Sequence, residues 1–349
     1  MNPSSHQWPL DDQHFDVKRL WPLSTGHKVT VAVIDSGVDA QHPDLNGRVL
    51  TGADFTGQGT SGRVDISSTG HGTAVASIIA GTGNGPDGVV GLAPNAMILP
   101  VRISDDLASS PTAEAQGIAY AVDHGARVIN ISVCSPIANP QVRAAIADAI
   151  GKDVVVVAAA GNEGSSTNLP QYPAAFPGIV AVTATDETGH LWSDVSSGPY
   201  LGVAAPGVNI YTAGREGSRT SMTGTSFAAP QVSAVVALLR AKYPAETANQ
   251  IIARLTSTAH SPSPGRSQNW GFGLIDPYAA LTTPEPASSA PNPLMDPIAA
   301  AEPAVSEPQT TYWTVWVAAT AVVLLTVGAL AFIRRGRSAE SKGRPQPRR

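Results

Sequence analysis

Three polar residues that together could perform nucleophilic catalysis stand in three separate short motifs of this chain. Ser226 lies in Gly-Thr-Ser-Phe-Ala-Ala-Pro, His71 in Gly-His-Gly-Thr, and Asp35 in Asp-Ser-Gly. A serine hydroxyl becomes a nucleophile when a histidine takes its proton, while a carboxylate orients that histidine and stabilises its cation. The motifs therefore predict acyl transfer with Ser226 as nucleophile, His71 as general base and then general acid, and Asp35 as the orienting carboxylate.

The neighbouring sequence predicts elements that would position these three side chains. The apolar residues 29–34 predict a buried strand that ends at Asp35, and helical patterns begin at His71 and at Ser226. A helix N-terminus has unpaired N–H groups and favours developing negative charge. Taken alone, Ser226 could equally be an ordinary N-cap, because serine is a preferred capping residue. The matching histidine and aspartate motifs favour the catalytic interpretation.

Apolar strand patterns alternate with helical patterns through the middle of the chain. Strands are predicted at 29–34, 97–101, 128–133, 154–159 and 179–183, and helices at 71–80, 112–124, 141–150 and 246–258. Strands that are apolar on both faces and separated by helices are typical of a mostly parallel sheet with helices on both faces, which is an α/β fold. Ligand sites in such sheets lie beyond the carboxyl ends of the strands, where Asp35 and Asn162 are expected.

The three motifs, in the order Asp, His, Ser and with Ala-Ala-Gly-Asn at 159–162, resemble the signatures of the subtilisin-like serine proteases. The likeness covers residues 18 to 281. It implies a subtilisin-like fold and a serine endopeptidase that cleaves polypeptides through an acyl-enzyme. It also implies that the Asn162 side chain and the backbone N–H of Ser226 stabilise the tetrahedral oxyanion. The alternative for Asn162 is a turn asparagine before Glu163-Gly164.

The same resemblance implies that the substrate pairs as an added strand along two edges of the cleft. The residues concerned are Ser132, Val133, Cys134, Ala158, Ala159, Ala160 and Gly161. Many relatives have glycine where Cys134 stands, so its side chain is expected to narrow the pocket for the residue before the scissile bond. An equally weighted alternative is that Cys134 is a small buried apolar residue. Nothing in the sequence marks its thiol as activated.

No cofactor and no metal site are predicted from the sequence. Residues 83–88 fit the dinucleotide pattern G-x-G-x-x-G, but they follow a helix and contain Pro-Asp, which suits a turn. The remaining histidines lack paired metal-ligand spacing. Asp44 matches a position that ligates calcium in several relatives, but the loop that completes their site differs here, so calcium is the less favoured interpretation. With 22 basic and 27 acidic residues, the chain has no general basic surface, and nucleic acid is not expected as a partner.

The sequence predicts five segments. They are an N-terminal arm (1–28), a peptidase domain (29–281), a Pro/Ala-rich linker (282–311), a transmembrane helix (312–333) and a basic cytoplasmic tail (334–349). Residues 313–333 carry no charge and are long enough to cross a membrane. The arginines behind them place the C-terminus in the cytoplasm and the peptidase domain outside the cell membrane. The polar residues 1–14 show no signal peptide, so either the start lies upstream of Met1, which is the favoured interpretation, or the membrane helix itself directs insertion with its N-terminal side outward.

A finer resemblance is to the mycosins, membrane-anchored subtilisin-like proteases associated with type VII secretion in actinobacteria. It rests on Arg-Leu-Trp-Pro at 19–22, the sequence around Ser226, the ending Gly-Leu-Ile-Asp-Pro-Tyr-Ala-Ala-Leu at 273–281, the proline-rich linker and the single apolar segment. The resemblance implies cleavage of exported proteins and a type VII secretion complex as partner. Mycosins generally carry an export signal and many carry disulfides, whereas this chain shows no signal and one cysteine. The alternatives are an assembly component with proteolysis secondary, or a general anchored degradative subtilisin.

Overall fold

The computed structural model describes residues 3–59, 61–105, 109–262, 265–287 and 289–295. The chain divides into two units, Met1–Ala301 and Glu302–Arg349. The second unit, with the predicted membrane helix at 312–333 and the basic tail at 334–349, lies outside the described residues. Within the described ranges, no helix combines the length and apolar character that a membrane crossing requires.

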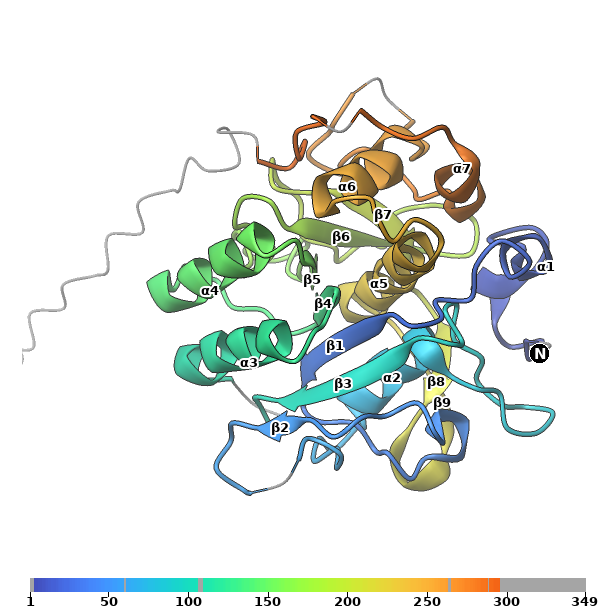
Figure 1. Ribbon diagram of the computed structural model, residues 1–349, viewed down its shortest axis with the longest axis vertical. Coiled ribbons are helices and arrows are strands. Elements are labelled where there is room, and N and C mark those ends of the chain that lie inside the picture. The colour runs from blue at the N-terminus through green and yellow to red at the C-terminus, as the bar shows by residue number, and fades with distance from the viewer. Residues whose placement is uncertain (1–2, 60, 106–108, 263–264, 288, 296–349) are drawn as a thin grey trace, which may run out of the picture. The chain divides into compact units, whose positions relative to one another are not determined.

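A seven-stranded parallel sheet forms the centre of the first unit (Figure 1). Its order is β2-β3-β1-β4-β5-β6-β7, and every adjacent pair runs parallel. The strands are β1 Thr30–Asp35, β2 Ala53–Asp54, β3 Met97–Arg102, β4 Val128–Ile131, β5 Val155–Ala159, β6 Val180–Thr185 and β7 Val203–Pro206. Because β1 pairs with β3 on one side and β4 on the other, the chain reverses its direction of winding here, and the carboxyl ends of β1 and β4 flank the switch point where sites form in such sheets.

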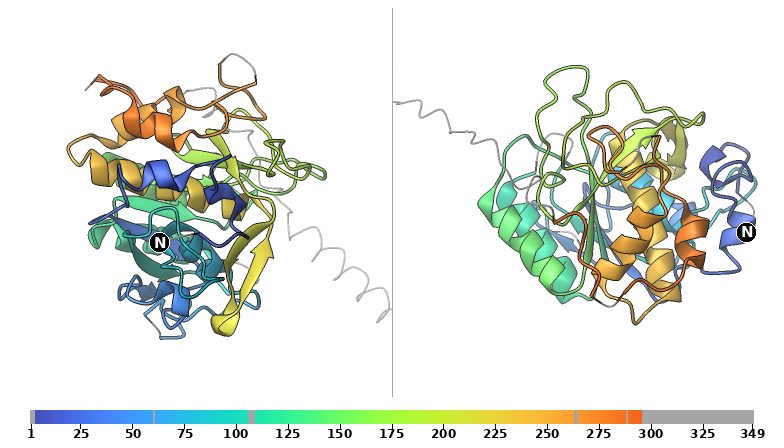
Figure 2. Two further views of the ribbon diagram at one scale, coloured as in Figure 1. Left: turned by 90° about the vertical axis from the view of Figure 1, so that its right-hand side faces the viewer. Right: turned by 90° about the horizontal axis from the view of Figure 1, so that it is seen from above.

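Helices cover both faces of the sheet, as the sequence predicts (Figure 2). The α-helices are α1 Val17–Leu20, α2 His71–Ala80, α3 Pro111–Asp123, α4 Pro140–Gly151, α5 Thr225–Lys242, α6 Ala248–Ser257 and α7 Pro277–Thr282. Helix α3 packs on β1 and β3 and α4 on β5, forming one hydrophobic core, while α2 and α5 pack on the opposite face and form the other. Among the described residues, short 3-10 helices occur at Trp8–Leu10, Pro43–Leu45 and Arg215–Gly217.

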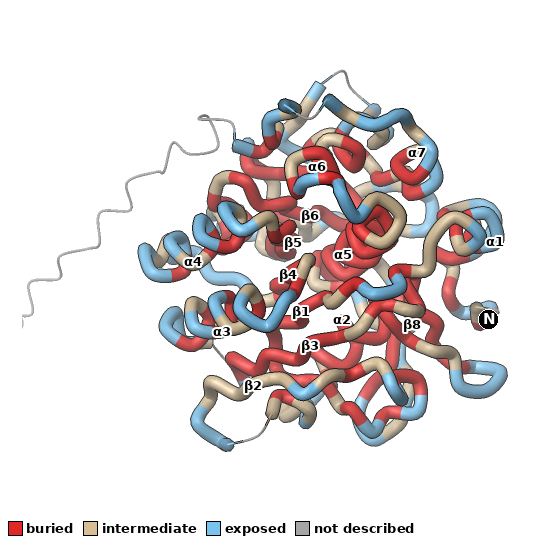
Figure 3. The backbone as a smooth tube through the Cα atoms, in the orientation of Figure 1, coloured by how far each residue is buried: buried red, intermediate tan, exposed pale blue. Residues whose placement is uncertain are grey.

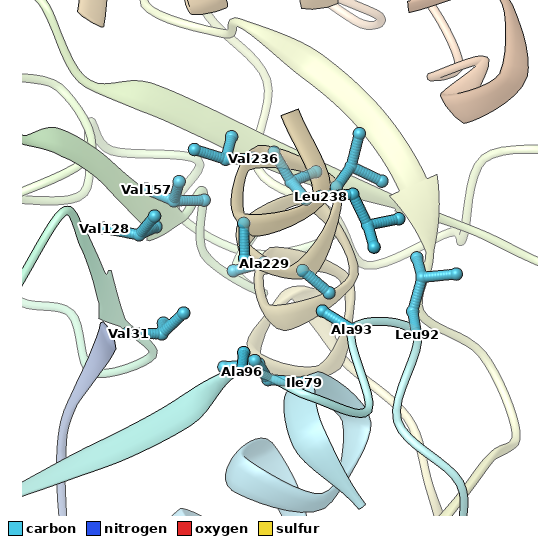
Figure 4. Close-up of a cluster of buried hydrophobic side chains, with 14 of the residues drawn as sticks. Val31, Ile79, Leu92, Ala93, Ala96, Val128, Val157, Ala229, Val236 and Leu238 are labelled. Carbon is cyan, nitrogen blue, oxygen red and sulfur yellow. The ribbon is translucent and has the colours of Figure 1, made fainter. Parts of the chain in front are cut away.

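Helix α5 runs through the interior, and almost every residue up to Arg240 is buried (Figure 3). A helix that is apolar on all sides must be buried on all sides, which the sheet, α2, α6 and α7 achieve together. Its side chains Ala229, Val236 and Leu238 share a core with Val31 and Val157 of the sheet (Figure 4). Ser226 therefore stands at the start of one of the most firmly packed elements of the domain.

The N-terminal arm packs against the domain. Phe15, Val17 and Leu20 are buried in the core on the α5 side of the sheet. The Trp21 Nε1–H donates to the Leu92 carbonyl at 3.1 Å. A pair of antiparallel strands that the sequence did not indicate, β8 Ile210–Ala213 and β9 Arg219–Met222, lies apart from the main sheet.

The chain stays packed on the domain beyond the boundary predicted at Leu281. Leu294 is buried in the core, Asn292 Nδ2 donates to the Gly178 carbonyl at 3.1 Å, and the Gly178 N–H donates to the Leu294 carbonyl at 2.9 Å. These residues fall in the stretch predicted as a linker, 282–311. The packed domain thus extends to residue 295, because the Leu294 side chain of this proline-rich segment is buried in the core.

Candidate active site

Asp35 and His71 meet where β1 ends and α2 begins. His71 Nδ1 lies 2.8 Å from Asp35 Oδ1, and the Asp35 side chain is 1% exposed against 25% for His71. Asp35 Oδ1 also accepts from the N–H and the hydroxyl of Ser36, at 2.8 and 3.1 Å. Because an ionised carboxylate only accepts hydrogen bonds, this contact selects the imidazole tautomer with its proton on Nδ1. Nε2 is then the nitrogen suited to act as a base.

The N-terminus of α2 is held by side chains that lie outside the helix. Its N-cap, Gly70, has a φ of 72° in the left-handed region that glycine tolerates and provides no side-chain cap. Three acceptors take the first N–H groups instead: Ser67 Oγ from His71 at 2.7 Å, Ser36 Oγ from Gly72 at 3.1 Å, and Asp65 Oδ2 from Thr73 at 2.8 Å. The backbone that carries the imidazole is therefore fixed by Ser36 of the Asp-Ser-Gly motif and by Asp65 and Ser67 of the loop before α2.

Asp65 supports the candidate site through Ser36 and the start of α2, and sequence reasoning missed it. Burial raises the pKa of its carboxyl, and repulsion from Asp35 adds to this against the hydrogen bonds from Thr73 and Ser36. The Ser36 hydroxyl lies 2.9 Å from Asp65 Oδ1 and 3.1 Å from Asp35 Oδ1, so it stands between two carboxyl groups. The available signal was an acidic residue close before a helix N-terminus, a favourable place for negative charge.

The start of α5 is tied to the end of β4 through Ser226. Pro230 has no N–H, so the Ser226 carbonyl four residues earlier loses its usual helical donor. Ser132 Oγ donates to that carbonyl at 3.0 Å instead, and Ser226 Oγ donates to the Ser132 carbonyl at 3.0 Å. Pro230 thus leaves the Ser226 carbonyl free to accept from Ser132, and this bond joins the start of α5 to the candidate substrate edge.

Two fully buried polar side chains extend this link. Asn130 Nδ2 donates to Ser132 Oγ at 2.9 Å, and Ser233 Oγ donates to Asn130 Oδ1 at 2.9 Å. Asn130 and Ser233 are both 0% exposed. A satisfied buried network rigidifies its surroundings, so these residues hold Ser226 against the sheet. Sequence reasoning passed over them, although a polar residue inside an otherwise apolar strand was the available signal.

His71 and Ser226 come from the N-termini of two helices that pack against each other. The ring centroids of His71 and Phe227, the residue after Ser226, are 5.4 Å apart. The structure therefore places all three predicted side chains in one region, with Asp35 bonded directly to His71. The Ser226 hydroxyl is bonded to the Ser132 carbonyl in this conformation, so proton transfer to the imidazole requires the hydroxyl to turn.

Asn162 lies beside the start of α5 with a defined amide orientation. Its Oδ1 accepts from the N–H of Thr225 at 3.0 Å and from the Thr225 hydroxyl at 2.9 Å. With the oxygen engaged, the NH₂ group is the end that can donate to a developing oxyanion next to Ser226. The sequence prediction placed Asn162 as this donor, and the orientation suits that role.

Replacing Asn162 with alanine is expected to lower kcat by roughly 10²–10³-fold, the usual cost of losing one oxyanion donor. KM should change little, because the lost interaction forms mainly in the transition state. Steady-state kinetics on a peptide substrate would measure both constants, with the exposed Asn168 replaced by alanine as control. An equal loss for both variants, or a change in KM alone, would contradict the donor role.

The two predicted substrate edges lie side by side at the carboxyl end of the sheet. Strands β4 and β5 pair with Ile131 opposite Ala158, so residues 132–134 and 158–161 leave the sheet next to each other. A cavity of about 280 Å³ adjoins the edge at 132–134 and is lined by Ser132, Val133 and His71 among others. The edge at 132–134 thus borders the space beside the imidazole.

Cys134 is exposed, so the alternative of a buried packing residue does not fit its position. Even so, protein atoms packed around its thiol partly exclude water and raise the pKa of the thiol to about 11, with a further contribution from the charges of Glu163 and Glu114. A thiol with this pKa is protonated near neutral pH and is a poor nucleophile. The sequence expectation that Cys134 is not a catalytic thiol agrees with this environment.

The residues around Asp44 do not suit calcium. The Asp44 side chain is 0% exposed and receives two hydrogen bonds from Arg219, at 2.7 and 3.0 Å. The N–H groups of Asn84 and Val89 donate to the same carboxylate at 2.8 and 3.1 Å. Burial acts to raise the pKa of Asp44, but these donors outweigh it and the pKa is lowered. A guanidinium and two amides occupy the directions a cation would need, and the described ranges contain no cluster of three or more metal-ligating side chains.

Arg219 therefore neutralises Asp44, as a bound cation could, and links β9 to the loop at 83–89. Replacing Arg219 with methionine should destabilise the fold by about 3 kcal/mol, because a buried carboxylate is left without its charge partner. Thermal unfolding with and without a chelator would test this, using Arg215→Met on the same hairpin as control, since Arg215 is half exposed. A melting temperature of the unaltered protein that falls by several degrees in chelator would contradict it.

An α/β fold that brings a serine, a histidine and an aspartate together beyond the carboxyl ends of parallel strands has the arrangement of a serine hydrolase. Residues 26–273 match the Subtilase family of peptidases. The chain therefore belongs to the subtilase family and is a subtilisin-like serine endopeptidase.

Individual relatives agree with this assignment. The chain is 37% identical to thermitase of Thermoactinomyces vulgaris over 270 residues, covering 77% of this chain and 94% of thermitase. It is similar in structure to the serine protease MycP1, an essential component of the type VII (ESX-1) secretion system, with a TM-score of 0.71, 33% identity and coverage of 81% and 90% of the two chains. The MycP3 protease of the type VII (ESX-3) secretion system gives a TM-score of 0.68 with 33% identity, covering 81% of this chain and 89% of MycP3.

Proposed function

We propose that this chain is a membrane-anchored serine endopeptidase that cleaves exported proteins of a type VII secretion system. The observation that carries the proposal is the structural likeness to MycP1 and MycP3, which are proteases of the type VII secretion systems ESX-1 and ESX-3. The uncharged residues 313–333, followed by a basic tail, supply a candidate anchor in the sequence. In this arrangement the peptidase domain faces outward and the C-terminus is cytoplasmic.

In the proposed mechanism, Ser226 attacks the scissile carbonyl while His71 Nε2 takes its proton. Asp35 stabilises the resulting imidazolium through the 2.8 Å contact with Nδ1. The Asn162 amide and the Ser226 N–H stabilise the oxyanion, at the positive end of the α5 dipole. His71 then protonates the leaving amine and activates water for hydrolysis of the acyl-enzyme.

Substrate alignment follows from the contacts around Ser132. An extended substrate segment that pairs with residues 132–134 would compete for the Ser132 carbonyl, to which the Ser226 hydroxyl donates in this structure. Substrate binding would then release the hydroxyl toward His71. The hydrogen bonds through Asn130 and Ser233 keep the carbonyl in place while this exchange occurs.

Complementation of a strain that lacks the protein would test the role in secretion. If the unaltered chain restores secretion and Ser226→Ala does not, proteolysis is the function that the secretion system requires. If Ser226→Ala restores secretion fully, the contribution is assembly. This second candidate function is favoured because MycP1 is an essential component of its secretion system. Unimpaired secretion in the deletion strain would instead support a general degradative peptidase.

Membrane anchoring is tested separately by alkaline extraction of membranes. The full-length chain should stay in the membrane pellet, while a chain that ends at residue 295 should appear in the soluble fraction. Added protease should remove the peptidase domain from intact spheroplasts and leave a tag on the C-terminus protected. Degradation of the tag in intact spheroplasts would overturn the proposed orientation.

A further inference from the structure

A buried carboxyl group that the peptidase mechanism does not use lies in the first turn of α3. Glu114 is 9% exposed, and its Oε1 has no hydrogen-bond partner among the residues that the structure describes. No ion pair of Glu114 is found in the described part of the chain. Burial raises the pKa of its carboxyl to about 7, so a large fraction of it is ionised at neutral pH. This side chain is unusual because buried carboxylates are normally paired.

Residues close to Glu114 in the chain and in the core border the candidate substrate edge. Ser104 and Asp105, which precede α3, line the cavity beside His71 together with Ser132 and Val133. Val133 packs on the same hydrophobic cluster as Ala113, the residue before Glu114. The charge of Glu114 also raises the pKa of the Cys134 thiol, so the carboxyl lies within electrostatic range of that side chain.

An unpaired carboxylate in this place costs folding free energy, because water no longer solvates it fully. A cationic side chain that reaches it from a bound ligand would remove that cost and add a charge-assisted hydrogen bond. Lysine and arginine are suited to this, since their aliphatic stems can lie along apolar surface while the charged end reaches a buried acceptor. Val133 provides such a surface at the edge of the cleft.

We propose that Glu114 is a specificity-determining residue that makes the enzyme prefer substrates with a lysine or arginine in the segment pairing with residues 132–134. Side chains alternate along an extended segment, so only some of its positions point toward α3. The preference should therefore be confined to particular positions and absent from the others. The inference rests on the proposed use of this edge for polypeptide substrates.

The test uses peptides of one sequence in which lysine or norleucine is placed at each position before the scissile bond in turn. In the unaltered enzyme, kcat/KM should be about ten- to hundredfold higher for lysine at the preferred position, as expected for a hydrogen bond to a charged group. Glu114→Gln keeps the shape and removes the charge, and should abolish this ratio while hydrolysis of the norleucine peptides is retained. Asp123→Asn, a 69% exposed carboxyl at the other end of α3, is the control and should leave the ratio unchanged.

A binding measurement separates this inference from the proposed catalytic function. In the Ser226→Ala background, fluorescence anisotropy should show tighter binding of the lysine peptide, and Glu114→Gln should remove the difference. The inference would be overturned if Glu114→Gln left the difference in affinity between the lysine and norleucine peptides unchanged. The melting temperature of the Glu114→Gln variant would show that it is folded. If the peptides bind as expected but the unaltered enzyme cleaves none of them, the specificity role stands and the proposed peptidase function fails.

Discussion

Replacing Ser226 with alanine is expected to reduce peptide turnover by about a million-fold, the scale of loss when a serine peptidase is deprived of its nucleophile. The residual rate would come from the oxyanion donors and substrate binding, which the substitution leaves in place. Folding should be retained, because Ser226 contributes one side-chain hydrogen bond, to the Ser132 carbonyl, worth about 1 kcal/mol. The backbone bond from Ser132 to the Ser226 carbonyl does not depend on the side chain.

Two measurements together test this prediction. Hydrolysis of a fluorogenic peptide gives the turnover, and labelling by a fluorophosphonate reports the nucleophile directly. Ser221→Ala is the matched control, because Ser221 is exposed on β9 only a few residues earlier. Undiminished labelling or cleavage by Ser226→Ala would assign the nucleophile to another residue.

The sequence predicted well the elements whose patterns are long and regular. The helix at 71–80 has the predicted bounds, and β1, β3 and β5 differ from the prediction by one residue at one or both ends. The strands β2, β7, β8 and β9 were missed because each has two to four residues and no repeating apolar pattern. Their formation depends on partners far away in the chain, as in β9, whose Arg219 reaches Asp44.

In the candidate site, too, residues in local motifs were predicted and residues that act through distant contacts were not. Asp35, His71 and Ser226 were found because each stands in a recognisable motif, and the structure brings their elements together. Asp65, Asn130 and Ser233 act through contacts that no local pattern contains. Similarly, Asp44 gave a calcium signal from its own motif, but the guanidinium that satisfies it lies 175 positions later. A motif identifies a candidate residue, whereas the charged groups around that residue are set by the tertiary fold.

Replacing Asp35 with alanine is expected to lower turnover on the order of 10⁴-fold, a loss second only to that expected for Ser226→Ala. Two contributions disappear together: the acceptor that holds the Nδ1–H tautomer of His71, and the charge that stabilises the imidazolium. The environment of Asp35 allows these to be separated. Its Oδ1 accepts from the Ser36 N–H, the Ser36 hydroxyl and His71, while Oδ2 is buried without a partner among the described residues.

An asparagine at position 35 should therefore turn its carbonyl oxygen toward the donors at the Oδ1 position, because its NH₂ group would face N–H groups there. The His71 tautomer would be kept and only the charge lost, so Asp35→Asn should retain more activity than Asp35→Ala. Turnover and the pH dependence of kcat/KM of both variants would test this. Asp65→Asn is the control, because the Asp65 carboxyl supports α2 without bonding the imidazole. If Asp35→Ala keeps more than a tenth of the activity, Asp35 does not orient the base. If the two variants are equally impaired, the charge, and not the acceptor position, accounts for the contribution of Asp35.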